Sequence, residues 1–261
     1  MSNLLDKKAF IFDLDGCLYR GCEPIEGAST VVAALRSRGK KILFLTNNST
    51  KTPAAYVDKL RSMGIGVSLE EVLTSSVATA NYIKRFGLGN CYAIGEEGLM
   101  TALKDEGFGI LGEEDAACAK YMVCGLDTHV DYQKLSAACL AIQGGAKFFA
   151  TNNDPSLPIE GGYLPGAGAI VSAIATATKM KPIIIGKPSS KVMRAALKKL
   201  GTKKDETAII GDTLNMDVKA GKGAGIFTVL VLTGSTSMQD LKHSKLKPDM
   251  VLASVADILK I

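Results

Sequence analysis

Short apolar runs, each followed by polar residues, recur along the chain and predict a parallel β-sheet. The first run, 9–12, contains no polar residue and is followed by Asp13, Asp15 and Gly16. A strand this uniformly apolar is typical of a sheet that is covered on both faces. Three later runs share this layout: 42–45 before Thr46, 183–185 before Gly186 and Lys187, and 208–210 before Gly211 and Asp212. Because open α/β sheets bind ligands at the carboxyl ends of their strands, we expect these polar ends to converge on one crevice.

Segments with helical spacing alternate with these runs and indicate an α/β fold. One helix is expected to begin at the Thr52-Pro53 pair and to end at Gly64. The others are predicted near 29–38, 77–86, 97–106, 131–143, 189–200, 214–222 and from about 254.

The middle of the chain has a weaker pattern and predicts an inserted domain. Its candidate strands are 91–94, 121–124 and 148–150, and a glycine-rich turn at 161–168 precedes an alanine-rich helix ending near 178. None of the four polar strand ends lies in this stretch. We therefore expect a core made of residues 1–79 and 181–261, with a smaller α/β domain, 80–180, inserted into it.

Composition predicts a soluble protein, and its positive net charge mildly favours anionic substrates. The 261 residues are 47% hydrophobic, and no apolar run approaches the about 20 residues of a membrane span. The N-terminus lacks the apolar region of a signal peptide, which predicts a cytoplasmic protein without a membrane partner. The net charge of +5 is spread over many sites, so we expect no nucleic-acid partner. The six cysteines form no Cys-x-x-Cys pair and are expected to be free thiols, and zinc is not expected.

Asp13 and Asp15 have the chemistry needed for phosphoryl transfer. A carboxylate can attack phosphorus and form an acyl phosphate. A second carboxyl can then protonate the leaving alkoxide. The pair Asp15-Gly16 also fits an ordinary surface turn. The buried strand that ends directly before Asp13 favours the catalytic interpretation.

Asp212 and Asp217 predict a magnesium site at a neighbouring strand end. Mg2+ takes one or two carboxylates together with waters and phosphate oxygens. Asp13 and Asp212 are the expected direct ligands, and Asp217 is expected to act through water or to orient Asp212. The alternative is that Asp212 or Asp217 caps the helix predicted at 214–222.

Two further strand ends fit an anion. The turn Thr46-Asn47-Asn48-Ser49 offers hydroxyl and backbone N–H groups that can cradle a phosphate oxygen. Lys187 is expected to neutralise the phosphoryl group and to lower the pKa of Asp13. Such turns and loop lysines are also common without any function, and only their place at strand ends favours a role.

The polar motifs at the strand ends, taken in their order along the chain, resemble those of the haloacid dehalogenase superfamily of phosphohydrolases. The matching residues are Asp13 to Gly16, Thr46, Lys187, Gly211-Asp212 and Asp217. Within that superfamily the chain is similar to the p-nitrophenylphosphatase/NagD-type branch. The stretches that carry this likeness are 12–19, 45–50, 150–154, 165–168 and 186–189. The sequence departs from the branch at Thr213 and Met216, on the metal side of the site.

The resemblance implies a Rossmann-like doubly wound core with a large α/β cap inserted between the second and third motifs. It also implies a role for each matched residue. Asp13 would be the nucleophile and Asp15 the general acid/base, with Mg2+ held by the Asp13 carboxylate, the Asp15 backbone carbonyl and Asp212. Gly16 and Asp217 would support the catalytic and metal-binding residues. Thr46 and Asn47 would bind phosphate beside Lys187. A cap loop with Asn152, Asn153 and Asp154 would help to choose the substrate.

The leading hypothesis is therefore Mg2+-dependent hydrolysis of small phosphomonoesters. A dehalogenase has no alkoxide to protonate, so Asp15 argues against one. One alternative is a phosphomutase, which would need a helical cap between Gly16 and Thr46, where the stretch is too short for one. The other is a non-catalytic phosphate-binding protein, which would be expected to have lost a motif residue, whereas all are present. Sugar phosphates, phosphoglycolate, nucleotides, pyridoxal phosphate and p-nitrophenyl phosphate all remain open as substrates, and the cap is a candidate surface for a homodimer.

Overall fold

The structure, a computed structural model, describes residues 4–159 and 161–261. The chain divides into two compact units. The first consists of Met1–Thr46, Pro53–Leu73 and Lys187–Ile261, and the second of Asn47–Thr52 and Thr74–Gly186. The domain expected at 80–180 lies within the second unit, whose bounds are wider at both ends and include 47–52.

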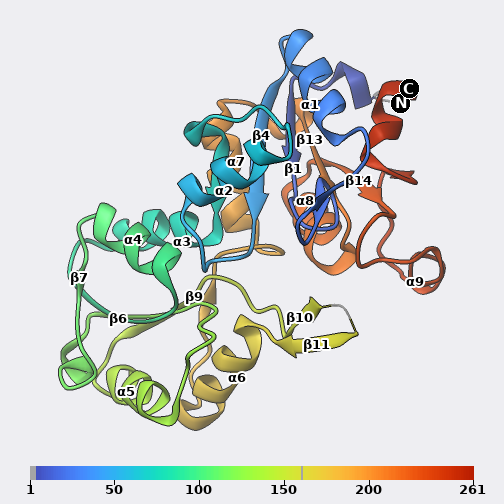
Figure 1. Ribbon diagram of the computed structural model, residues 1–261. Coiled ribbons are helices and arrows are strands. Elements are labelled where there is room, and N and C mark those ends of the chain that lie inside the picture. Colours follow the sequence, from blue (N-terminus) through green and yellow to red (C-terminus); the bar gives the residue numbers. More distant parts are fainter. Residues whose placement is uncertain (1–3, 160) are drawn as a thin grey trace. The chain divides into compact units, whose positions relative to one another are not determined.

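A six-stranded sheet forms the centre of the first unit (Figure 1). Its strand order is β15 (Met250–Leu252), β14 (Phe227–Val231), β13 (Thr207–Gly211), β1 (Ala9–Phe12), β4 (Lys41–Thr46) and β5 (Val72–Thr74). The pairs β14–β15, β13–β14, β1–β13 and β1–β4 are parallel, and Phe12 is aligned with both Phe44 and Ile210. The strand order reverses at β1, which is where open α/β sheets bind ligands.

Helices cover both faces of this sheet. They are α1 (Ala28–Ser37), α2 (Pro53–Ser62), α7 (Ser190–Leu200), α8 (Lys219–Ala224) and α9 (Met238–His243). Phe10 and Phe12 pack on one face with Leu35 of α1 and Leu60 of α2. On the other face, a Cβ at Gly221 of α8 would lie 2.6 Å from Cγ2 of Ile209, so the close approach of helix and strand needs glycine. The predicted doubly wound α/β fold is confirmed.

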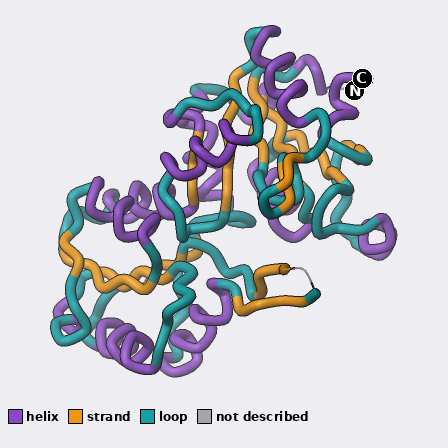
Figure 2. The backbone as a smooth tube through the Cα atoms, viewed as in Figure 1, coloured by secondary structure: helices purple, strands orange, loops and turns teal. Residues whose placement is uncertain are grey.

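The second unit contains a parallel sheet of its own (Figures 1 and 2). Its strand order is β12 (Ile183–Ile184), β9 (Lys147–Ala150), β8 (Tyr121–Cys124), β6 (Asn90–Ile94) and β7 (Gly109–Ile110). The helices are α3 (Ser75–Lys84), α4 (Glu97–Asp105), α5 (Tyr132–Gln143) and α6 (Ala167–Thr178). Residues of α5 and α6 share a core with Met122 and Phe148, whereas Tyr82 of α3 packs on Phe149, which points to the opposite face. The unit is thus a second α/β layer structure.

Several elements differ from the sequence-based expectation. The run 183–185 was expected in the core sheet, which is wrong, because β12 pairs with β9 in the sheet of the second unit. The glycine-rich stretch 161–168 is not a plain turn. It contains β11 (Gly162–Pro165), which pairs with β10 (Ser156–Ile159), and then begins α6. The hairpin β2 (Tyr19–Arg20) and β3 (Glu23–Pro24), together with α9 and β15, had no counterpart in the prediction. These elements are short, so their periodicity gives little signal.

Candidate active site

The carboxyl edge of the first sheet gathers acidic residues from separate parts of the chain. Asp13 comes directly after β1, and its backbone N–H donates to the carbonyl oxygen of Ile210 over 2.8 Å, which continues the strand pairing. Asp212 follows β13 in the same way, and Thr46 is the last residue of β4. The strand ends at 13, 46 and 212 therefore lie along one edge, as the sequence predicts.

Lys187 joins two of the acids in a buried ion network. Its Nζ lies 2.7 Å from Oδ1 of Asp13 and 2.6 Å from Oδ1 of Asp217. The lysine is only 2% exposed. The shared ammonium fixes both carboxylates, and breaking one partner of such a buried pair is costly because it leaves a charge unpaired.

Burial governs the protonation of this network. Burial disfavours the charged carboxylates and raises the pKa of Asp13 and of Asp217 above the ordinary value, even though Lys187 acts in the opposite direction. Burial also acts against the Lys187 ammonium, but its attraction to Asp13 and Asp217 is stronger and raises the lysine pKa. Lys187 lowers the pKa of Asp13, as expected, but burial outweighs this effect, so the net pKa of Asp13 is raised.

The same acids form a set of oxygen donors that fits a divalent metal ion. Carboxylate oxygens of Asp13, Asp212 and Asp217 all lie within 4.8 Å of one another, and Asp212 and Asp217 are almost fully buried. Lys187 is in direct contact with Asp13 and Asp217, whereas no described ion pair joins Asp212 to a cation. Buried negative charge left uncompensated is costly, and hard oxygen ligands are those preferred by Mg2+ and Ca2+.

A loop after β14 holds Asp212, and the sequence analysis did not single it out. The N–H of Ser235 donates to Oδ2 of Asp212 over 2.5 Å, and the N–H of Thr236 donates to the Asp212 carbonyl oxygen over 3.2 Å. A Cβ at Gly234 would lie 2.0 Å from Asp212 Oδ2, so this approach requires glycine. Thr233 donates its hydroxyl to the carbonyl oxygen of Gly16 over 2.7 Å. The loop is itself a polar stretch after an apolar run, a signal that could have been found.

Thr213, one of the two departures from the branch pattern, connects two of the acids. Its N–H donates to Oδ2 of Asp217 over 3.1 Å, and its hydroxyl donates to Oδ1 of Asp212 over 3.3 Å. Asp217 thus has one oxygen on Lys187 and the other on Thr213. A residue that differs from the expected pattern still supplies contacts to the acidic group.

Asp15 lies in a more open setting than Asp13. Its backbone forms an isolated β-bridge with Tyr19, and the N–H of Gly16 donates to the Tyr19 carbonyl oxygen over 2.7 Å. Gly16 has φ +80°, and a Cβ there would lie 2.6 Å from Asp212, so both conformation and space demand glycine. Partial burial raises the pKa of Asp15, and the nearby charge of Lys59 opposes this rise.

Tyr56 of α2 is a further residue that the sequence analysis missed. It is 3% exposed, and its hydroxyl is hydrogen-bonded to the side chain of Thr46. Burial, the largest cause, raises the pKa of Tyr56, so the phenol stays protonated. The contact orients the Thr46 hydroxyl at the end of β4.

The other predicted binding residues gather in the second unit. The side-chain amide of Asn152 donates to the carbonyl oxygen of Asn47 over 2.7 Å, and that of Asn47 donates to Oδ2 of Asp154 over 3.0 Å. The N–H of Asp154 donates to Oδ1 of Asn152 over 3.0 Å, whereas Asn153 is exposed. The structure therefore brings Asn47, Asn152 and Asp154 together, and their roles toward phosphate stay predictions.

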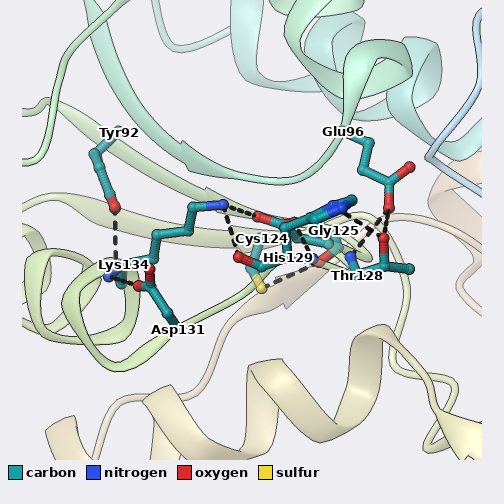
Figure 3. A network of polar contacts seen from close by, with 9 residues as sticks. Tyr92, Glu96, Cys124, Gly125, Thr128, His129, Asp131 and Lys134 are labelled. Carbon is teal, nitrogen blue, oxygen red and sulfur yellow. Dashed lines mark hydrogen bonds and ion pairs between the residues drawn. The ribbon is translucent and has the colours of Figure 1, made fainter.

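A second acidic cluster lies at the end of β8 in the second unit (Figure 3). Glu96 accepts from the N–H of Thr128 over 3.0 Å and from its hydroxyl over 2.8 Å. Asp127 accepts from the N–H of His129 over 2.8 Å and from Nζ of Lys134 over 2.9 Å. Oxygens of Glu96 and Asp127 and a ring nitrogen of His129 lie close enough for a metal ion. However, Lys134 already supplies the positive charge, so the cluster stabilises the loop after β8.

Comparison with known proteins identifies the class. Residues 10–109 match the sequence profile of the haloacid dehalogenase-like hydrolases, and residues 184–258 match a profile described as HAD-hydrolase-like. The chain belongs to the haloacid dehalogenase-like hydrolase family.

Its relatives are phosphatases. The chain is 43% identical over 242 residues to an acid sugar phosphatase of Staphylococcus epidermidis, covering 92% of each chain. It is 40% identical over 251 residues to the 5'-nucleotidase YutF of Bacillus subtilis, covering 96% of each. A p-nitrophenyl phosphatase from Archaeoglobus fulgidus superposes with a TM-score of 0.92 at 37% identity, covering 98% of this chain and 99% of that one. The prediction of a phosphatase of this family is confirmed.

Proposed function

We propose that this protein hydrolyses small phosphomonoesters in a Mg2+-dependent reaction that proceeds through an aspartyl phosphate on Asp13. The observation that carries the proposal is the buried network of Lys187 with Asp13 and Asp217, next to Asp212 at the same sheet edge. A structural ion pair would need only one carboxylate. Here an excess of acid surrounds the one ammonium, as expected of a site that receives a cation and a phosphate.

In the first step, an oxygen of the Asp13 carboxylate attacks phosphorus, and the bond from phosphorus to the ester oxygen breaks. Asp15 in its protonated form gives its proton to that oxygen, so the product leaves as an alcohol. In the second step, Asp15 accepts a proton from water, which attacks the phosphoryl group and releases phosphate and the Asp13 carboxylate. The partial burial that raises the pKa of Asp15 favours the protonated form needed first.

The metal would be held by the Asp13 and Asp212 carboxylates and by the backbone carbonyl of Asp15. When bound, Mg2+ would neutralise charge on the phosphoryl oxygens and favour the ionised form of Asp13. Lys187 supplies a second positive charge at Asp13, and Thr46 offers a hydroxyl that Tyr56 orients. Asp217, bound to both Lys187 and Thr213, would hold the lysine in place.

The substrate would be a small phosphorylated metabolite, chosen in part by the second unit acting as the cap. The relatives bear names that refer to sugar phosphates, 5'-nucleotides and p-nitrophenyl phosphate. These names fit a site that accepts several leaving groups. The cluster of Asn47, Asn152 and Asp154 is the candidate for substrate selection within that unit, with Asn153 exposed beside it.

The test is phosphate release from a panel of phosphomonoesters, with and without Mg2+, by the wild type and by Asp13→Asn. We expect metal-dependent release that the substitution abolishes, because the amide keeps the shape of the nucleophile but not its charge. Asp58→Asn, an exposed acid on α2, is the matched control and should retain activity. Turnover by Asp13→Asn close to that of the control would rule out the covalent route.

A further inference from the structure

Helix α2 places a lysine beside the residue proposed as the general acid. Nζ of Lys59 lies 3.8 Å from the centre of the Tyr19 ring. Tyr19 is 2% exposed, and its backbone is bridged to that of Asp15. The lysine itself is only partly buried. A positive charge is thus held against the aromatic ring that adjoins Asp15.

The two lysines of this site serve different acids. Lys187 contacts Asp13 and Asp217, where the phosphoryl group would be bound. Lys59 is the charged group that acts most strongly in favour of the Asp15 carboxylate. Because a general acid must lie within hydrogen-bond reach of the atom it protonates, Asp15 marks the position of the leaving oxygen. The next few atoms of the leaving group are therefore close to Lys59.

We propose that Lys59 binds a negatively charged group on the leaving alcohol, so that the enzyme prefers phosphomonoesters whose alcohol portion carries a carboxylate or a second phosphate. This inference rests on the proposed function, since only a phosphatase with Asp15 as its acid has a leaving group at this place. The Tyr19 ring, whose centre lies 3.8 Å from the Lys59 ammonium, holds the partly buried lysine in position. A charge-assisted contact of this kind is stronger than a neutral hydrogen bond.

A purely structural role for Lys59 makes a different prediction. If the lysine only packs on Tyr19 or stabilises the charge of Asp15, its loss should slow hydrolysis of all phosphomonoesters by the same factor. If it binds the leaving group, the loss should depend on the charge of that group. The ratio of kcat/KM between matched substrates separates the two, because an effect on folding cancels in it, and an effect on Asp15 cancels when the two leaving alcohols have similar acidity.

The experiment compares two substrate pairs that differ in one charge of the leaving group. The first pair is 2-phosphoglycolate and ethyl phosphate, and the second is glycerol 1,3-bisphosphate and glycerol 1-phosphate. We expect Lys59→Met to lower kcat/KM about tenfold for one or both anionic members and less than about twofold for the neutral ones. The pair that responds identifies the anion as carboxylate or phosphate. Lys59→Arg should retain the preference.

Lys198→Met is the matched control, because it removes the same charge from an exposed position on α7 of the same unit. It should leave both ratios unchanged. An equal loss on all four substrates by Lys59→Met, or no loss on any, would overturn the proposal. If the wild type hydrolyses none of the four esters nor p-nitrophenyl phosphate, the proposed function itself fails, which is a separate result.

The wild type offers a second measurement that does not depend on how well the variant folds. Between about 0.01 M and 1 M salt the screening length falls from about 30 Å to about 3 Å. The preference for the anionic member of the responding pair should shrink over this range. A preference that is absent at low salt in both pairs, or that does not change with salt, would contradict an electrostatic contact with the leaving group.

Discussion

At the scale of single residues, the environment decides what each acid can do. Asp13 and Asp217 share one buried ammonium, so both are held in fixed positions while burial raises their pKa values. Asp15 is exposed, and the ion pairs described for that network join Lys187 to Asp13 and Asp217, not to Asp15. These surroundings fit the proposed division between a fixed nucleophile, Asp13, and a more accessible acid, Asp15.

Replacing Asp15 with Asn should separate substrates by the acidity of their leaving group. An alkoxide needs a proton to leave, whereas p-nitrophenolate scarcely does. We expect a loss of about 10²-fold or more in kcat for an alkyl phosphate and a clearly smaller loss for p-nitrophenyl phosphate. Steady-state kinetics on both substrates measures this, with Asp58→Asn as the control. Equal losses would argue against Asp15 as the general acid.

Gly234 gives a prediction that concerns metal binding and not turnover. A Cβ at this position would lie 2.0 Å from Asp212 Oδ2, so Gly234→Ala must displace the carboxylate or the loop. We expect the affinity for Mg2+ to fall about tenfold, which is about 1.4 kcal/mol. Calorimetric titration of the metal measures this without substrate.

Gly223→Ala is the matched control for this change. Gly223 lies in helix α8, has space for a Cβ, and should bind metal as the wild type does. Equal metal affinity in the two variants would show that the loop at Thr233 to Thr236 does not position Asp212.

At the scale of elements, the ends of strands matter more than their interiors. β1, β4 and β13 have similar buried, mostly apolar interiors, but a residue of the site lies at or directly after the end of each strand. The loop after β14 follows the same rule through Ser235, although its contribution is a backbone N–H. The polar stretch after β14 was a signal for this loop, but the sequence does not show which of its backbone N–H groups meets Asp212.

Asp249 gives an element-scale prediction for the edge of the same sheet. Its carboxylate accepts from the N–H and the hydroxyl of Thr228, both over 2.8 Å, and lies 2.5 Å from Nζ of Lys222. Burial acts to raise the pKa of Asp249, but these hydrogen bonds outweigh it and lower the pKa. Asp249→Asn should therefore destabilise the protein by about 1 kcal/mol at pH 7, a small value because solvent screens this partly exposed pair.

The sign of the pH dependence follows from the lowered pKa. The contribution of Asp249 is present above the unfolded value near 3.8 and is lost as the pH falls through the lower folded value. Urea unfolding of the wild type and of Asp249→Asn should show a difference at pH 7 that narrows toward pH 3. A difference that is independent of pH would mean that the charge of Asp249 contributes nothing.

At the scale of the whole molecule, the chain builds two α/β units, each with its own parallel sheet. The sequence predicted the alternation of strand and helix for most of the longer elements, because apolar runs and helical spacing are local features. The sequence did not show to which sheet a strand belongs. The pattern of β12 is that of a core strand, yet β12 pairs with β9 of the second unit. The chain returns to the first unit only at Lys187. Among the described helices, none is long and apolar enough to span a membrane.

Residue types and short spacings were enough to predict the fold class, the family and the acids at the strand ends. Which of these residues meet depends on long-range packing. Lys187 reaches Asp13 and Asp217, Gly234 and Ser235 enclose Asp212, and Tyr56 orients Thr46, through contacts between segments far apart in the chain. The pKa of Asp13 likewise depends on packing. The sequence predicted that Lys187 would lower this pKa, but the burial that outweighs Lys187 arises only when the edge of the sheet is packed.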